Sequence, residues 1–216
     1  MDQIAKTYGE DVKVVLVQNP LSFHKRAMPA SQAAYAAHLQ GKFWEYHDMV
    51  FENNKALEDA DLEKYAQDLG LDMEKWKKDK ETKEIRQWLE SHQALATALG
   101  ATGTPAFFIN GEFLSGAQPF EKFQEIIDVQ IMKADKLLAK DVPLGALHAV
   151  LSGNAKKGAY RRFVIEGKNP PKPQDPKAAE ANKEPFSKRI AELPISDSPR
   201  KGKGDDVIIT ECSDFQ

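Results

Sequence analysis

Leu99–Gly111 reads Leu-Gly-Ala-Thr-Gly-Thr-Pro-Ala-Phe-Phe-Ile-Asn-Gly, and this stretch decides the fold. Its glycines and proline predict the end of a helix and a tight turn, and the apolar run Ala106–Ile109 predicts a short buried strand. Asn110–Gly111 is a hairpin turn signal, so the chain should return through Glu112–Ser115. Because proline cannot donate to a strand ladder, we expect Pro105 to be the first residue of the strand, preceded by a cis peptide bond.

Other strands are predicted far from this turn. Val12–Gln18 and Val207–Cys212 are nearly continuous apolar runs, a pattern typical of strands buried on both faces. Arg189–Ile195 is a further strand candidate. Residues 27–100 carry helical periodicity almost throughout, so a helical block separates the first strand from the central turn. The pattern predicts an α/β fold with a mixed sheet.

The chain divides into three segments by composition. Residues 1–139 form the expected core, which contains the helical insertion at about 27–100 and ends in an amphipathic helix. Residues 140–186 contain a short helix and then a linker rich in proline and lysine, which favours an extended spacer. Residues 187–216 hold the last two predicted strands.

Charge and composition exclude several classes of function. With 29% charged residues and a net charge of −3, the chain has no general basic field for nucleic acid. No apolar run approaches the roughly 20 residues that a membrane span requires, and the N-terminus lacks the apolar core of a signal peptide. The single cysteine excludes an intrachain disulfide, and the histidines show no metal-ligand spacing, so we expect neither a metal nor a cofactor.

Several stretches together resemble one family. Gly100–Gly111 and the Gly-Ala-Gln-Pro of Gly116–Pro119 are similar to the cis-proline loop and hairpin of DsbA-like thiol-disulfide oxidoreductases. Lys13–His24, Ala34–Phe51 and the terminal Val207–Gln216 agree with the same family in the same order. The resemblance implies a thioredoxin-like mixed sheet with an inserted helical domain.

The resemblance also implies a substrate site and a class of partner. Gly103, Thr104 and Pro105 would form a loop that hydrogen-bonds an extended substrate by adding it as a strand, and the alternative is a purely structural turn. The partners would be extended or unfolded polypeptides that contain cysteines. The family implies the periplasm or cell envelope, and without a leader in this sequence a cytoplasmic location stays open.

The family's reacting dithiol has no counterpart in this sequence. In DsbA-like proteins, the motif similar to Glu211–Gln216 is followed at once by C-x-x-C. The strand leading to that position would comprise Cys212, Ser213, Asp214, Phe215 and Gln216. Cys212 lies five positions before the expected first active-site cysteine, so we expect it to be buried and inert. Exchange needs a reactive thiolate and a resolving thiol, so the chain alone should be inactive.

Two explanations of this pattern stay open. The chain is a piece of a protein with tandem DsbA-like repeats, or a UGA codon after Gln216 encodes selenocysteine and was read as a stop. In either case we expect the last strands to complete the sheet. They would do so within the chain, as a circular permutation, or by exchange with a second copy in a swapped homodimer.

Two other functions remain alternatives. A thioredoxin fold that binds extended peptides without redox chemistry would need no dithiol, and a glutathione-transferase relative would carry a serine in place of the cysteine. The histidines offer little further guidance from the sequence. His24 lies in a loop and is expected at the surface, whereas His38, His47 and His92 lie on helices as core-edge or solvated residues.

Overall fold

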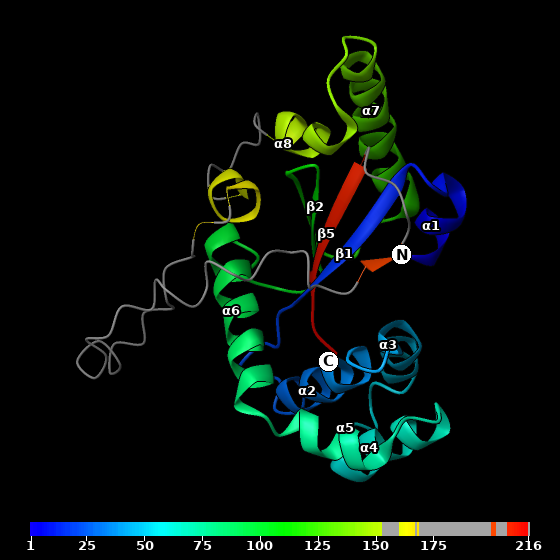
Figure 1. The fold of residues 1–216 in the computed structure, drawn as a ribbon, viewed down its shortest axis with the longest axis vertical. Helices are drawn as coiled ribbons and strands as arrows, with labels where there is room; N and C mark the ends of the chain where they lie inside the picture. Colours follow the sequence, from blue (N-terminus) through cyan, green and yellow to red (C-terminus); the bar gives the residue numbers. More distant parts are fainter. Residues whose placement is uncertain (153–159, 167, 169–199, 202–206, 216) are drawn as a thin grey trace, which may run out of the picture. The chain divides into compact units, whose positions relative to one another are not determined.

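The computed structural model of the chain describes residues 1–152, 160–166, 168, 200–201 and 207–215 (Figure 1). It divides into two compact units. The first consists of Met1–Val17 with Ala94–Cys212, and the second of Gln18–Gln93 with Ser213–Gln216. The predicted strand at 189–195, nearly all of the linker at 167–184, and Gln216 lie outside the described residues.

A five-stranded sheet forms the centre of the first unit, in the order β3-β2-β5-β1-β4. Its strands are β1 (Val12–Gln18), β2 (Ala106–Ile109), β3 (Glu112–Ser115), β4 (Arg200–Lys201) and β5 (Val207–Ser213). Figure 1 shows the last strand, β5, between β1 and β2. Strands β1 and β5 are the most apolar runs of the chain, and burying both faces of such strands removes the most apolar surface from water.

The directions of the strands follow from their hydrogen bonds. Val207 donates its backbone N–H to the Asp11 carbonyl at 3.1 Å, where both strands begin, and Asn19 donates to the Ser213 carbonyl at 2.7 Å, where both end. Strands β1 and β5 therefore run in the same direction. Strand β2 is antiparallel to both β3 and β5, and β4 is antiparallel to β1, so the sheet is mixed.

Helices pack against the sheet within the first unit. The elements are α1 (Asp2–Tyr8), α7 (Phe120–Leu138), η1 (Leu144–Ala146), α8 (Leu147–Ser152) and η2 (Arg161–Ile165). The Tyr8 hydroxyl donates to Asp128 at 2.6 Å, which joins α1 to α7, and Phe107 of β2 meets Phe123 of α7 edge to face. A hydrophobic core cluster brings together buried residues from several elements of the chain, among them Val17, Leu99, Phe108, Tyr160 and Cys212.

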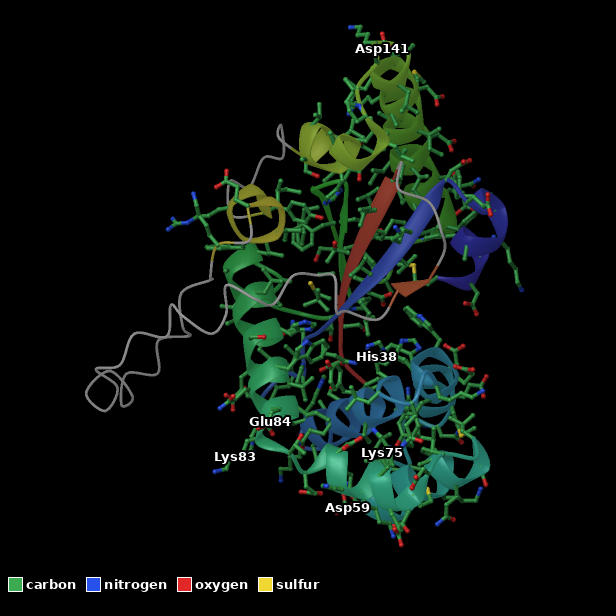
Figure 2. All side chains as sticks on the ribbon, in the orientation of Figure 1. His38, Asp59, Lys75, Lys83, Glu84 and Asp141 are labelled. Atoms are coloured by element: carbon green, nitrogen blue, oxygen red, sulfur yellow. The ribbon has the colours of Figure 1, made fainter. Side chains whose placement is uncertain are left out.

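The second unit is helical. It contains α2 (Ala27–His38), α3 (Phe43–Glu52), α4 (Asp59–Asp68), α5 (Met73–Lys80) and most of α6 (Lys83–Leu99). Figure 2 shows the side chains of these helices, with His38 labelled on α2 and Asp59 on α4. The alanine-rich face of α2 lets its neighbours approach closely, and the Trp76 indole N–H reaches the Ala33 carbonyl at 3.0 Å.

The fold class agrees with the prediction. A mixed sheet, a helical segment between β1 and β2, and a central strand taken from the end of the chain make a thioredoxin-like α/β fold in circularly permuted order. One boundary differs, because β2 begins at Ala106 and Pro105 precedes it. Proline has no N–H to give to the ladder, although the Pro105 carbonyl still accepts a hydrogen bond from Gly116 at 2.9 Å.

Candidate functional site

The loop Gly103–Pro105 lies in the first unit, immediately before β2. The Thr104–Pro105 peptide bond is cis, Gly103 is exposed, and Thr104 and Pro105 are half-buried. The next residue, Ala106, stands directly opposite Cys212 on β5. The predicted substrate loop therefore adjoins Cys212, near the carboxyl-terminal end of the central strand, and its first residue, Gly103, is exposed.

Cys212 is fully buried in the core cluster that also contains Leu99, Phe108 and Tyr160. Burial, reinforced by the neighbouring Glu211 carboxylate, raises the pKa of the Cys212 thiol to about 12. Because the thiolate is the form that attacks disulfides and binds metals, very little reactive sulfur exists here at neutral pH. Cys212 is a small core residue, in agreement with the sequence analysis.

Glu211 is a buried carboxyl on the central strand that sequence reasoning did not single out. Only 8% of the residue is exposed, and burial raises its pKa to about 7, an effect opposed by the charge of the chain's N-terminal amine. It stands directly opposite Phe107 on β2. A glutamate inside the run Val-Ile-Ile-Thr-Glu-Cys was the available signal, because an acid rarely occupies a buried strand without a function.

Asp214 and His24 form a close pair within the second unit. The Asp214 side chain is 1% exposed, and its Oδ2 lies 2.7 Å from His24 Nδ1. The same oxygen accepts the backbone N–H of Leu21 at 3.3 Å. The carboxylate therefore has partners that compensate for its burial, as buried charges require.

Phe215 and Ser213 flank this pair and are also buried. The Phe215 ring contacts His47 and Phe51, with centroids 5.7 and 5.2 Å away. Phe215 therefore packs against α3 within the second unit. His47 lies at the edge of the core, in agreement with the sequence analysis.

His92 on α6 departs from the expectation of a core-edge or solvated residue. It is 6% exposed, its Nδ1 accepts the backbone N–H of Gln18 at 3.2 Å, and burial lowers its pKa to about 3. It is therefore a neutral core histidine that caps the end of β1. Nothing in the local sequence distinguishes it from a solvated helical histidine, because its partner is 74 positions away.

The predicted site residues fall into two groups. Gly103, Thr104, Pro105 and Cys212 belong to the first unit, whereas Ser213, Asp214 and Phe215 belong to the second, and Gln216 lies outside the described residues. Within the described part of the chain, no cluster of three or more His, Cys, Asp and Glu side chains could hold a metal ion. No helix of the described residues combines the length and apolar character needed to cross a bilayer.

Together, the permuted mixed sheet, the helical insertion and the loop at Thr104–Pro105 define a thioredoxin-fold protein. Comparison with known families is specific: the model of the DSBA-like thioredoxin domain matches residues 1–128. The chain belongs to this family.

Curated relatives match over part of their length. The chain is 36% identical over 116 residues to a Na(+)/H(+) antiporter NhaA of Herminiimonas arsenicoxydans, which covers 54% of this chain and 18% of the relative. It is 32% identical over 114 residues to NhaA 1 of Mycolicibacterium vanbaalenii, covering 51% and 18% of the two chains. For NhaA 3 of Salinispora tropica, the identity is 35% over 88 residues, covering 41% and 14%. The chain thus spans less than a fifth of these relatives, and no solved structure matches it.

Proposed function

We propose that this chain is the fold-bearing part of a thiol-disulfide oxidoreductase that acts on cysteines of extended or unfolded polypeptides. Gly103, Thr104 and Pro105 would bind the substrate backbone. The reacting dithiol would be a C-x-x-C segment placed directly after Gln216, as in the family motif. Cys212 would take no part in the exchange.

The observation that carries this proposal is the central place of β5 beside β2. The register of Ala106 opposite Cys212 means that the loop before β2 and the end of β5 are neighbours in one sheet. A dithiol placed after Gln216 would then follow, a few residues on, the strand residue Cys212 that stands beside that loop. This register supports substrate binding by the loop and sulfur chemistry by a segment that follows β5.

The same proposal covers the organisation of the chain. We assign residues 1–139 to the thioredoxin-like core with its helical insertion, 140–186 to a helix and linker, and 187–216 to the strands that complete the sheet. Completion would occur within one chain, with a swapped homodimer as the alternative. The family favours the periplasm or cell envelope, where disulfide chemistry persists.

The antiporter relatives fit this proposal when the extent of the match is considered. Their name describes proteins of which this chain matches less than one fifth. The aligned length of 116 residues is comparable with the 128 residues matched by the DSBA-like family model. We therefore propose that the shared part is a DsbA-like segment within those proteins and that antiport belongs to their remainder.

The test is insulin reduction with dithiothreitol. Residues 1–216 should give the background rate, and a chain lengthened by a C-x-x-C segment after Gln216 should accelerate precipitation of the insulin B chain. If residues 1–216 were active and Cys212→Ala abolished that activity, the proposal would be wrong, because the buried cysteine would be the nucleophile.

A second candidate is a peptide-binding module without redox chemistry. The observation that favours it is the single cysteine of the sequence, buried and with a raised pKa. Inactivity of both chains in the insulin assay, together with binding of a fluorescent unfolded polypeptide that contains no cysteine, would favour this module.

A further inference from the structure

The pair formed by Asp214 and His24 has the geometry of an oriented base. We infer that the His24 imidazole exchanges a proton with the reacting thiol and that Asp214 is its positioning residue. This inference rests on the proposed oxidoreductase function. The contacts that support it all lie within the second unit.

The hydrogen bonds of Asp214 fix the tautomer of His24. A carboxylate can only accept hydrogen bonds, so the Nδ1 atom, 2.7 Å from Oδ2, must carry the proton. In the neutral imidazole, Nε2 is then the acceptor. The orientation of the ring thus leaves Nε2 as the atom that can take a proton from a thiol.

The loop that carries His24 is held by several hydrogen bonds. The Asn19 N–H donates to the Ser213 carbonyl at 2.7 Å, and the Gln93 amide donates to the Pro20 carbonyl. The backbone N–H of His24 reaches the Leu21 carbonyl at 3.0 Å. His24 therefore occupies a fixed position beside the end of β5, in contrast to the loosely held surface residue that its sequence position suggested.

The imidazole is accessible despite its buried partner. The His24 side chain is 28% exposed, and the neighbouring Phe23 is 71% exposed, with its ring edge-on at 4.5 Å from the imidazole. An exposed aromatic ring beside a base provides an apolar contact for a peptide that brings a thiol to that base.

Three other histidines of the described chain differ from His24 in their own burial or in the burial of their partner. His92 and His148 are buried, and burial lowers the pKa of both. His47 also pairs with a carboxylate, 2.9 Å away, but its partner Asp48 is 48% exposed. A solvated carboxylate holds an imidazole less firmly, so His24 is the better-oriented base.

The proton transfer balances without an external oxidant. The substrate thiol gives its proton to Nε2 of His24, and the resulting thiolate attacks one sulfur of the C-x-x-C disulfide. A new S–S bond forms while the old one breaks, and the departing sulfur leaves as a thiolate that takes the proton back from Nε2. The reverse sequence reduces a substrate disulfide with the dithiol.

The first test uses residues 1–216 and nitrogen-15 NMR of the imidazoles. We expect His24 to show the Nδ1–H tautomer in the wild type and to lose it in Asp214→Asn. His38 on α2, labelled in Figure 2, is the control and should keep its tautomer in both proteins. An Nε2–H tautomer at His24 in the wild type would overturn the inference.

The second test uses the lengthened chain with C-x-x-C after Gln216. We expect His24→Ala to slow exchange with a cysteine-containing peptide about 100-fold, the lower end of the usual range for a lost proton-transfer group. Free imidazole should restore part of the rate, which a purely structural role would not allow. His38→Ala should react at the wild-type rate.

The outcomes separate this inference from the proposed function. An active lengthened chain whose rate is unchanged in His24→Ala and Asp214→Asn overturns the role of His24 and leaves the oxidoreductase function standing. An inactive wild-type lengthened chain overturns both. If His24→Ala does not fold, as judged by circular dichroism, Asp214→Asn and His24→Gln decide the question by the same exchange rates.

Discussion

Ala106 and Cys212 stand directly opposite each other on neighbouring antiparallel strands, although they come from the middle and the end of the chain. Strand β5 consequently forms backbone hydrogen bonds with β2 on one side and β1 on the other. A strand in that place stabilises the whole sheet, because its loss leaves the backbone edges of two neighbouring strands unpaired at once.

Deletion of Val207–Gln216 should therefore unfold the first unit. We expect loss of the cooperative thermal transition, since the remaining strands no longer share one core and the typical stability of a domain is only about 5–15 kcal/mol. Circular dichroism at increasing temperature measures this. The synthetic peptide Val207–Gln216, added in trans, should restore the transition, and a truncated chain that melts like the wild type would contradict the prediction.

Light scattering on residues 1–216 then distinguishes the two ways of completing the sheet. A monomer mass with an intact transition means that β5 inserts into its own chain. A dimer that becomes monomeric and unfolded on deletion of Val207–Gln216 means that the strand is exchanged between copies.

Much of this fold could be predicted because its elements carry their own patterns. The apolar runs Val12–Gln18 and Val207–Cys212 need two buried faces, and only a central place in a sheet provides them. The turn before β2 and the hairpin after it depend on glycine, proline and asparagine, whose backbone preferences are local.

The polar contacts of the core could not be predicted, since each depends on a partner far along the chain. Asp214 meets His24 across 190 positions, and Tyr160 meets Thr210 across 50. Tyr160 lies at the edge of a charged, proline-rich stretch, so its composition indicated a spacer, yet it is fully buried. The Tyr160 ring lies 5.3 Å from that of Phe108, and this apolar contact, which no local sequence pattern predicts, accounts for its burial.

Alkylation of Cys212 tests directly whether burial keeps its thiol from reacting. Iodoacetamide at pH 8 should leave the folded protein unmodified over hours and alkylate it fully in guanidinium chloride, because the thiolate is scarce and the sulfur inaccessible. Mass spectrometry measures both. Rapid modification of the folded protein, at the rate of the denatured one, would show that the sulfur is exposed.

A buried network of hydrogen bonds joins α8 to the sheet, and its contribution to stability can be tested at Tyr160. The Tyr160 hydroxyl lies 3.2 Å from Thr210 Oγ1 and 3.3 Å from His148 Nε2. His148 Nδ1 lies 3.0 Å from Asn110 Oδ1, which also accepts the backbone N–H of Ile208. Asn110 can use that oxygen only as an acceptor, so His148 donates from Nδ1 and accepts from Tyr160.

Tyr160→Phe should lower the free energy of unfolding by about 1–3 kcal/mol, because it leaves Thr210 and His148 without this partner inside the core. Urea unfolding followed by fluorescence measures the change. Tyr8→Phe is the matched control: its hydroxyl bonds Asp128 at an exposed site, so its loss should change stability by no more than about 0.5 kcal/mol. Equal effects of the two substitutions would argue against a buried network.

Glu211 makes stability depend on pH in a direction that can be worked out. The pKa of the Glu211 carboxyl is about 7 in the folded protein, whereas its ordinary value in an unfolded chain is 4.5. At this group the folded state therefore binds more protons between these values, so the contribution of Glu211 to stability is fully present below pH 4.5 and is lost as pH rises through 7. This single group accounts for a loss of about 3 kcal/mol by pH 8.

Glu211→Gln removes that titration while keeping the size of the side chain. The difference in free energy of unfolding between Glu211→Gln and the wild type should therefore rise by about 3 kcal/mol from pH 4.5 to pH 8. His92 and His148, whose lowered pKa values destabilise the fold as pH falls below 6.5, are present in both proteins and cancel in this difference. Denaturant titrations at several pH values give the curves, and parallel curves would mean that Glu211 reaches water in the folded protein and titrates as an ordinary carboxyl.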